Sequence, residues 1–276
     1  MSLRVLISMD MEGVAGIVHE AQTDPYAAAH AAAYQRASAW MTDEANAAIR
    51  GAFAAGATQV LVNDAHWDGR NLLADRLDPR AELLGGSPKP LSMMEGVREA
   101  DVACLVGYHG RAGTAGAVID HTYNDTIARV ALNGVEVGEI GLNAALAGSV
   151  GVPIVLVTGD TATCDEASAL LGADLATVAT KASLGRQAAR SLHPAEACRR
   201  IEAAAAVACR ATRTPWRVSE PVELVVQFVR THHADMAMLL PHAERRDGRT
   251  IAYRAATMSE GFQAWRAMMN LATVPG

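Results

Sequence analysis

Short apolar runs alternate with segments of helical periodicity through the first three quarters of the chain. Strands are predicted at residues 4–9, 58–62, 101–106 and 153–157, where runs rich in Val, Ile and Leu end at Gly or polar residues. Helices are predicted at residues 27–55, 138–147, 163–172 and 195–210, which end or begin at signals such as Gly56, Gly172 and Pro194. This alternation predicts an α/β fold, a mostly parallel sheet with helices on both faces.

The chain beyond residue 211 has a different pattern. Residues 214–216 (Thr-Pro-Trp) indicate a linker or turn, and strand patterns at 221–229 and 250–254 precede a helical pattern at 259–273. We therefore expect residues 1–211 to form the main α/β domain, which would hold any catalytic site. Residues 212–276 would form a small C-terminal α+β appendage, beside that domain or within it.

Composition narrows the classes of function. Half of the 276 residues are apolar, the net charge is −6, and Lys and Arg are scattered, so we expect neither a nucleic-acid nor a membrane partner. The apolar run before Asp10 is too short for a signal peptide, and nothing approaches the roughly 20 apolar residues of a spanning helix. A cytoplasmic protein is expected. The four cysteines lie far apart without a C-x-x-C motif, which predicts buried, reduced thiols.

Polar residues follow the predicted strands at their carboxyl ends. Asp10 and Glu12 come after the first strand, His66 after the second and His109 after the third. Side chains two apart on an extended backbone point the same way, and two carboxylates that close need a cation or a shared proton. Because parallel strands end at one edge of a sheet, we expect these four side chains to converge.

Glu139 is a fifth candidate. It stands at the start of a predicted helix inside an apolar run, so its carboxylate would be partly buried and would need a partner. Two histidines and three carboxylates suit zinc or another first-row dication better than calcium or magnesium. Five ligands are too many for one tetrahedral ion but fit two ions about 3.5 Å apart. Such a pair is typical of hydrolases.

Each residue also has a simpler explanation when taken alone. A histidine after a strand is more often a hydrogen-bonded loop residue than a ligand. Glu139 could be a helix N-terminal carboxylate favoured by the helix dipole, and Asp10 and Glu12 could form a turn and a cap. Asp64 and Asp160 also follow strands, and roles as caps or turn formers explain them equally well.

His121 follows a stretch of small residues at 111–116, which could line or gate a pocket. No G-x-x-x-x-G-K-[ST] pattern occurs, so this stretch is not a phosphate loop. His121 could move protons or have a structural role in a strand. Its own neighbourhood favours the structural role.

Four segments together resemble the D-aminopeptidase family of dinuclear zinc peptidases. They are residues 8–13 (SMDMEG), 62–66 (VNDAH), 107–109 (GYH) and 137–144 (VGEIGLNA), in that order. The similarity extends from the first strand to at least Asp160 and continues more weakly through the closing helix. The order of four motifs makes the resemblance specific.

The resemblance implies a role for each candidate residue. Asp10 would bridge two zinc ions, with Glu12 and His109 on one ion and His66 and Glu139 on the other. His121 would be catalytic, which reverses the preference for a structural role. The resemblance further implies two Zn²⁺ per chain, a short peptide or amino-acid amide as substrate, and a homodecamer of two stacked five-membered rings.

We therefore predict a zinc aminopeptidase that removes N-terminal residues, with a preference for D- or L-residues that no motif encodes. Two alternatives remain. A two-metal hydrolase of another ester or of phosphoesters is disfavoured because Arg111 and Lys89 are the only obvious cations near the motifs, and surface roles suit both. A peptide- or metal-binding accessory of transport would bind without turnover.

Overall fold

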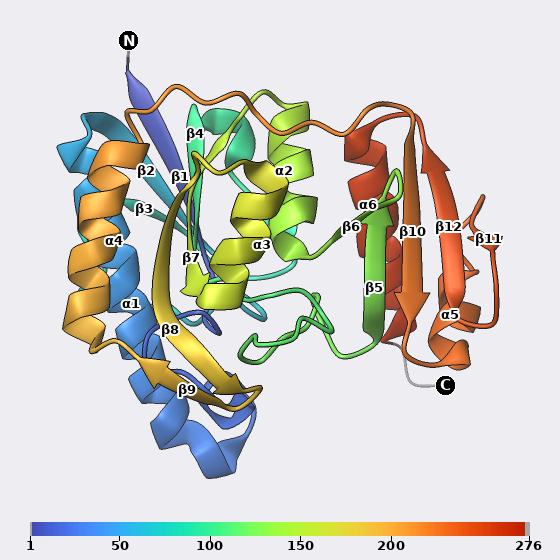
Figure 1. Cartoon of the computed structure of the whole chain (residues 1–276), viewed down its shortest axis with the longest axis horizontal. Coiled ribbons are helices and arrows are strands. Elements are labelled where there is room, and N and C mark those ends of the chain that lie inside the picture. The colour runs from blue at the N-terminus through green and yellow to red at the C-terminus, as the bar shows by residue number, and fades with distance from the viewer. Residues whose placement is uncertain (1, 274–276) are drawn as a thin grey trace.

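The computed structural model describes residues 2–273, which form two sheets with helices packed around and between them (Figure 1). The main sheet has the order β3-β2-β1-β4-β7-β8-β9. Its strands are β1 (Leu3–Met9), β2 (Ala57–Asp64), β3 (Glu82–Leu84), β4 (Val102–Val106), β7 (Ile154–Asp160), β8 (Ala176–Gly185) and β9 (Ala188–Ser191). All neighbours are parallel except β8 and β9, which form an antiparallel pair.

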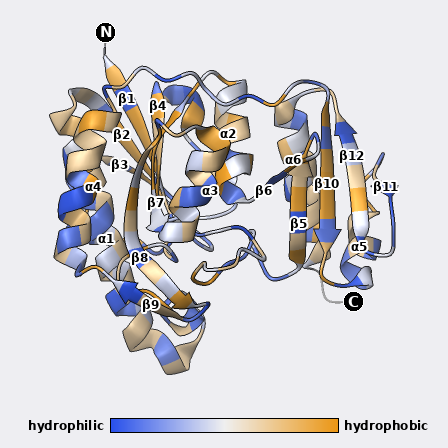
Figure 2. Ribbon diagram, in the orientation of Figure 1, coloured by the Kyte–Doolittle hydropathy of each residue, from blue (hydrophilic) through white to orange (hydrophobic). Residues whose placement is uncertain are grey.

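Helices cover both faces of this sheet. One face packs against α1 (Ala31–Ala54) and α4 (Pro194–Ala208), and the other against α2 (Glu139–Ser149) and α3 (Thr161–Leu171). The abundance of alanine and glycine allows close helix packing: a Cβ on Gly51 of α1 would lie 2.5 Å from the Glu202 carbonyl oxygen of α4. The strands between these layers are mostly hydrophobic (Figure 2), as expected for a parallel sheet buried on both faces.

The second sheet is antiparallel and has the order β11-β12-β10-β5-β6. Its strands are β5 (Ile127–Leu132), β6 (Val135–Val137), β10 (Val222–Phe228), β11 (Glu244–Arg245) and β12 (Thr250–Ala255). It packs against α5 (Thr231–Ala237) and α6 (Met258–Ala272), whose buried residues include Phe262 and Trp265. One core cluster joins this layer to α2 and to the main sheet.

The structure confirms the predicted α/β fold with a mostly parallel sheet between helices. Because β5 and β6 come from the middle of the chain, residues 212–276 do not build the second layer alone. The division into domains at residue 211 stays a prediction. Helix α3 begins at Thr161, two residues before the predicted start, because Asp160 accepts a hydrogen bond from the Thr163 backbone N–H at 2.8 Å and so caps the helix.

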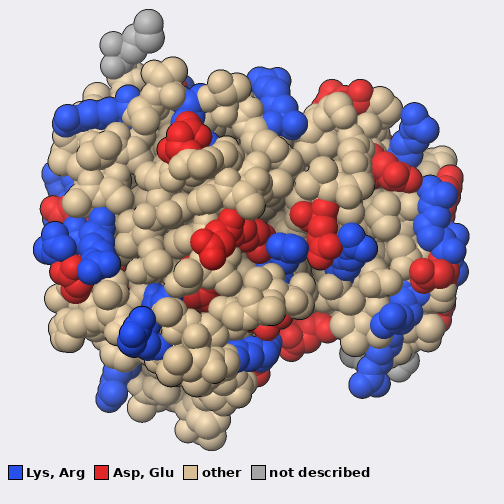
Figure 3. Space-filling view, viewed as in Figure 1, with Lys and Arg blue, Asp and Glu red and all other residues tan. Residues whose placement is uncertain are grey.

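Short 3-10 turns complete the fold at Glu20–Gln22, Ala28–His30, Ala74–Arg76, Ser92–Met94 and Val97–Glu99. Within residues 2–273 no helix is long and apolar enough to cross a bilayer. On the face shown in Figure 3, basic and acidic side chains are interspersed. All four cysteines are free thiols, and three are buried, in agreement with the prediction from their spacing.

Candidate metal centre

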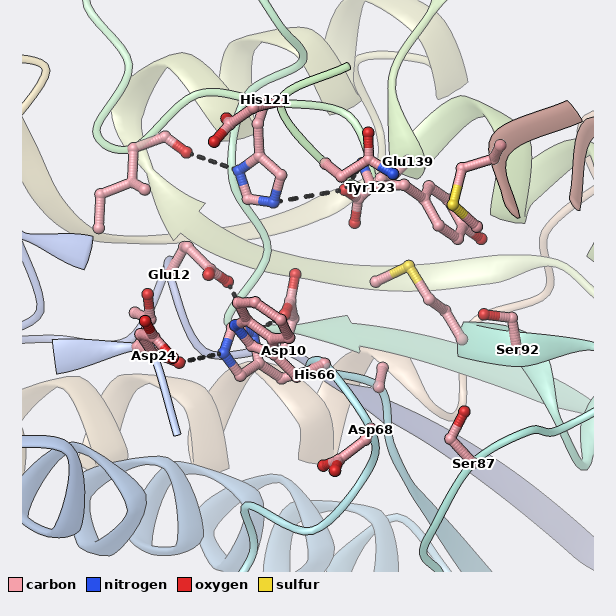
Figure 4. Close-up of a pocket in the computed structure, with 18 of the residues that line it drawn as sticks. Asp10, Glu12, Asp24, His66, Asp68, Ser87, Ser92, His121, Tyr123 and Glu139 are labelled. Carbon is pink, nitrogen blue, oxygen red and sulfur yellow. Dashed lines mark hydrogen bonds and ion pairs between the residues drawn. The ribbon is translucent and has the colours of Figure 1, made fainter. Parts of the chain in front are cut away.

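The carboxyl ends of three adjacent strands carry four of the five predicted ligands. Asp10 and Glu12 follow β1, His66 follows β2 and His109 follows β4. Glu139, the first residue of α2, joins them. Figure 4 shows Asp10, Glu12 and His66 close together in the cavity, with Glu139 beside His121. Strands β2 and β3 follow on one side of β1, and β4 and β7 on the other. The cluster therefore lies where the strand order reverses, at a topological switch point of the sheet.

The loops after β1 and β4 are held against each other by backbone contacts. The N–H of Asp10 donates to the Val106 carbonyl and that of Gly13 to the Gly107 carbonyl, both at 2.8 Å. A Cβ on Gly13 would lie 1.9 Å from the Tyr108 carbonyl oxygen. A Cβ on Gly107, which has a φ of +74°, would lie 2.2 Å from the Asp10 carbonyl oxygen. Both positions require glycine, which lets the loops that carry Asp10 and His109 approach this closely.

The predicted residues form two adjoining groups. One contains Asp10, Glu12 and His66 and the other His109, His121 and Glu139, and within each group the potential ligand atoms lie within 4.8 Å of one another. The Nδ1 atom of His66 lies 3.2 Å from carboxylate oxygens of both Asp10 and Glu12. The Nε2 atom of His109 lies 3.3 Å from Glu139 Oε1 and 3.5 Å from Asp10 Oδ2. Asp10 therefore faces both groups, as a bridging carboxylate would.

The short distances pair the candidate ligands differently from the pairing that the family resemblance implies. The structure places Glu12 with His66 and Glu139 with His109, whereas the resemblance pairs Glu12 with His109 and His66 with Glu139. The assignment of ligands to individual ions stays a prediction. The central position of Asp10 is common to both arrangements.

The hydrogen bonds of the two histidines determine which ring nitrogen can bind a metal. His66 Nε2 lies 2.8 Å from the Thr23 carbonyl oxygen, and His109 Nδ1 lies 3.0 Å from the Gly110 carbonyl oxygen. A carbonyl oxygen only accepts, so these two nitrogens carry the protons. In the neutral rings the lone pairs therefore lie on the opposite nitrogens, which face the carboxylates. Metal-ligating histidines are usually held in this way.

Several buried polar atoms of the cluster lack partners, and bound divalent cations would supply them. The buried atoms Asp10 Oδ2, Glu12 Oε2 and His109 Nε2 have no hydrogen-bond partner among the described residues. Burial and repulsion by Glu12 raise the pKa of Asp10 to about 7. Burial also opposes ionisation of Glu12, but His66 outweighs it and holds the pKa of that carboxyl well below its usual range. Nitrogen and carboxylate donors in this arrangement fit zinc.

Backbone groups outside the cluster hold its side chains in place. The Met11 N–H donates to Asp10 Oδ1 at 2.9 Å, and the Tyr123 N–H donates to Glu139 Oε1 at 2.6 Å. Lys181 of β8 donates to the Glu12 carbonyl oxygen. Lys181 was not among the residues expected from the sequence, because a single lysine in an Ala- and Thr-rich run was its only signal.

His121 lies beside the metal-binding candidates. Its ring stacks on His109 with centroids 3.9 Å apart and an interplanar angle of 15°, and its Nε2 lies 3.9 Å from Glu139 Oε1. Its Nδ1, 2.9 Å from the Ile119 carbonyl oxygen, must carry a proton. Burial and the charge of His109 lower the pKa of His121, so the neutral ring has its lone pair on Nε2.

Asp64 and Asp160, the two other acidic residues at strand ends, have structural roles. Asp64 accepts from the backbone N–H groups of Asn71 and Leu72, at 2.6 and 2.8 Å. Asp160 caps α3 and accepts from the Val118 N–H at 2.6 Å. The explanation of Asp160 as a cap is confirmed, whereas Asp64 holds the loop at Asn71 and Leu72.

Comparison with known proteins agrees with this geometry. The family model described as D-aminopeptidase (Peptidase_M55) matches residues 3–267. The chain belongs to the D-aminopeptidase family. It is 35% identical over 274 residues to a D-aminopeptidase of Bacillus subtilis (strain 168), covering 98% of both chains. The solved structure of the Zn-dependent D-aminopeptidase DppA of Bacillus subtilis, described as a self-compartmentalizing protease, matches with a TM-score of 0.93 and 33% identity over 99% of both chains. The predicted family of peptide hydrolases is confirmed.

Proposed function

We propose that the chain is a zinc-dependent aminopeptidase that removes N-terminal residues, including D-residues, from short peptides and amino-acid amides. Two Zn²⁺ per chain would be held by Asp10, Glu12, His66, His109 and Glu139. One observation carries the proposal: His66 and His109 each donate outward to a backbone carbonyl and turn the other nitrogen toward buried carboxylates. Family membership and the zinc dependence of a relative support it.

Zinc, when bound, supplies Lewis acidity for the peptide carbonyl and lowers the pKa of water. The side chains of the protein would hold the ions in place and transfer the proton. The five proposed ligand residues are only 3–4% exposed, so the surrounding fold keeps most bulk water away from the cluster. With Nδ1 held by the Ile119 carbonyl, His121 would accept a proton at Nε2 and return it to the leaving amine nitrogen.

The cavity beside the cluster has a volume of about 670 Å³, within the range of small-molecule sites. Its wall includes Asp24 and Asp125, which form no ion pair with the described residues. Their negative field would favour the free ammonium group that an aminopeptidase substrate carries.

We also propose that the protein assembles into a homo-oligomer, since a relative is described as self-compartmentalizing. The decamer implied by the resemblance predicts a particle of ten times the 29.0 kDa of one chain in sedimentation analysis. A monomer or dimer would contradict it. The cytoplasmic location stays a prediction.

An activity screen tests the proposed function. Zinc-loaded protein would be assayed with the amides of D- and L-alanine and with a chromogenic phosphate ester. We expect amide hydrolysis that disappears when the metal is removed, and no turnover of the ester. Hydrolysis of the ester alone would identify a phosphoesterase. Bound zinc and peptide affinity without any turnover would identify a binding accessory.

A further inference from the structure

Two cationic side chains in the cavity wall form no ion pair within residues 2–273. Arg266 of α6 lines the cavity, forms no ion pair with the described residues, and has its Nε and Nη1 atoms buried without a hydrogen-bond partner there. Lys89 also lines the cavity and donates only to the carbonyl oxygens of Asp64 and Leu84, at 2.6 and 3.3 Å. The surface role expected for Lys89 is therefore wrong, because its ammonium group turns inward to these carbonyls.

A third cation in the same wall, Arg186, does form ion pairs. Arg186 is neutralised by Glu20 and by Asp120, whose carboxylate lies 3.0 Å from its Nε. Arg266 and Lys89 lack such compensation although the cavity is rich in carboxylates. Buried guanidinium N–H groups without acceptors are costly, so an acceptor supplied by a ligand would stabilise them.

The two free cations lie near each other. Burial is the main cause that lowers the pKa of Lys89; the charges of Asp64 and Glu95 oppose it, and the charge of Arg266 adds to it. Neither cation forms an ion pair with a carboxylate of the described residues. Two neighbouring positive charges in this state form a site for an anion, and the planar guanidinium group suits a carboxylate in particular.

Tyr123 connects this part of the wall to the candidate metal centre. Its N–H donates to Glu139 Oε1 at 2.6 Å. Its ring packs edge-to-face on Trp265, the residue before Arg266, with centroids 5.3 Å apart and an interplanar angle of 80°. The cavity wall therefore contains the carboxylates and imidazoles of the cluster as well as the two cations, and Tyr123 contacts both Glu139 and the neighbour of Arg266.

We propose that Arg266, assisted by Lys89, binds the α-carboxylate of a short peptide whose amino end lies at the metal-binding cluster. This inference rests on the proposed aminopeptidase function and specifies its substrate class. The preferred substrates are zwitterionic short peptides with a free carboxyl terminus. Peptides with an amidated carboxyl end lose this interaction.

The test compares alanyl-alanine, in the stereochemistry that is turned over fastest, with the same dipeptide carrying a C-terminal amide. In the zinc-loaded wild type, kcat/KM is expected to be higher for the free acid. Arg266→Gln should lower kcat/KM for the free acid about tenfold to a hundredfold, mainly through KM, and so remove the preference. Lys89→Gln should act in the same direction by less. Arg254→Gln, at an exposed position of β12 outside the cavity, is the matched control.

An equal loss on the acid and the amide in Arg266→Gln, at unchanged zinc content, would overturn the inference. A wild type that prefers the amide would overturn it as well. If the wild type hydrolyses neither dipeptide nor the alanine amides, the proposed function fails. If it hydrolyses neither dipeptide, calorimetric binding of both dipeptides to the zinc-loaded protein decides the inference separately. Tighter binding of the acid that Arg266→Gln abolishes would support it, whereas equal affinities would exclude it.

Discussion

Lys181→Met tests how the loop that carries Glu12 is held in place. Lys181 is only 3% exposed and donates to the carbonyl oxygens of Glu12, Val14 and Ile17, the last two at 2.9 and 2.5 Å. These three acceptors belong to an irregular loop that begins directly after β1. Methionine has a similar length but no donor, so the substitution removes the three hydrogen bonds and leaves little empty space.

The expected loss of stability is a difference between two effects. Hydrogen bonds from a charged donor contribute about 1.5–3 kcal/mol each, so three give roughly 5–9 kcal/mol. Against this, burial lowers the pKa of Lys181 from 10.5 to about 8, which corresponds to a cost of about 3 kcal/mol for keeping the ammonium charged. The variant should therefore be destabilised by about 2–6 kcal/mol.

The decisive readout is zinc affinity, measured by competition with a chromogenic chelator. We expect Lys181→Met to weaken it about tenfold to a hundredfold, because the group that orients a ligand-bearing loop is lost. Leu224→Ala, a core truncation in β10, should cost about 2–5 kcal/mol of stability but leave zinc affinity unchanged. Wild-type zinc affinity in Lys181→Met would refute the reasoning.

Two further predictions concern proton transfer and pH dependence. His121→Asn should lower kcat by about a hundredfold to ten thousandfold at unchanged zinc content, and a wild-type kcat in steady-state assays would contradict its role. Glu44 is buried in α1, accepts from the Ala15 N–H at 2.8 Å, and has a pKa raised by burial from 4.5 to about 7. Since the folded state holds this proton more tightly than the unfolded chain, stability is lost as the pH rises from about 4.5 to 7. The free energy of unfolding of Glu44→Gln should therefore exceed that of the wild type by up to about 3 kcal/mol at pH 8 but hardly at pH 4.5. Urea denaturation at fixed protein concentration measures the difference. A difference independent of pH would contradict the assignment.

The sequence was most informative where apolar runs end in polar residues. The strands near Asp10, His66 and His109 were predictable because buried parallel strands are continuous Val-, Ile- and Leu-rich runs. Their convergence followed because parallel strands end at one edge of a sheet. The register that brings His66 within 3.2 Å of both carboxylates could not be derived, because it depends on pairing between distant segments.

Other parts of the fold had weak local signals. The strand β8 is rich in Ala and Thr, and β6 has only three residues, so neither shows a clear hydrophobic run. The sequence also could not assign Arg266, since a lone arginine on a predicted helix is usually a solvent-exposed residue. Only the tertiary structure shows that Arg266 lines the cavity and that two of its nitrogen atoms have no partner among the described residues.

The central claim is that side chains from distant parts of the chain bind two zinc ions together. The most direct measurement is zinc per chain, by mass spectrometry of elements, for the wild type, Asp10→Asn and the control Asp125→Asn. Asp125 lines the same cavity but lies outside the cluster. We expect two ions in the wild type and the control, and far less in Asp10→Asn, since the carboxylate proposed to bind both ions is lost. A wild type without zinc, or Asp10→Asn with the same content as the wild type, would contradict the claim.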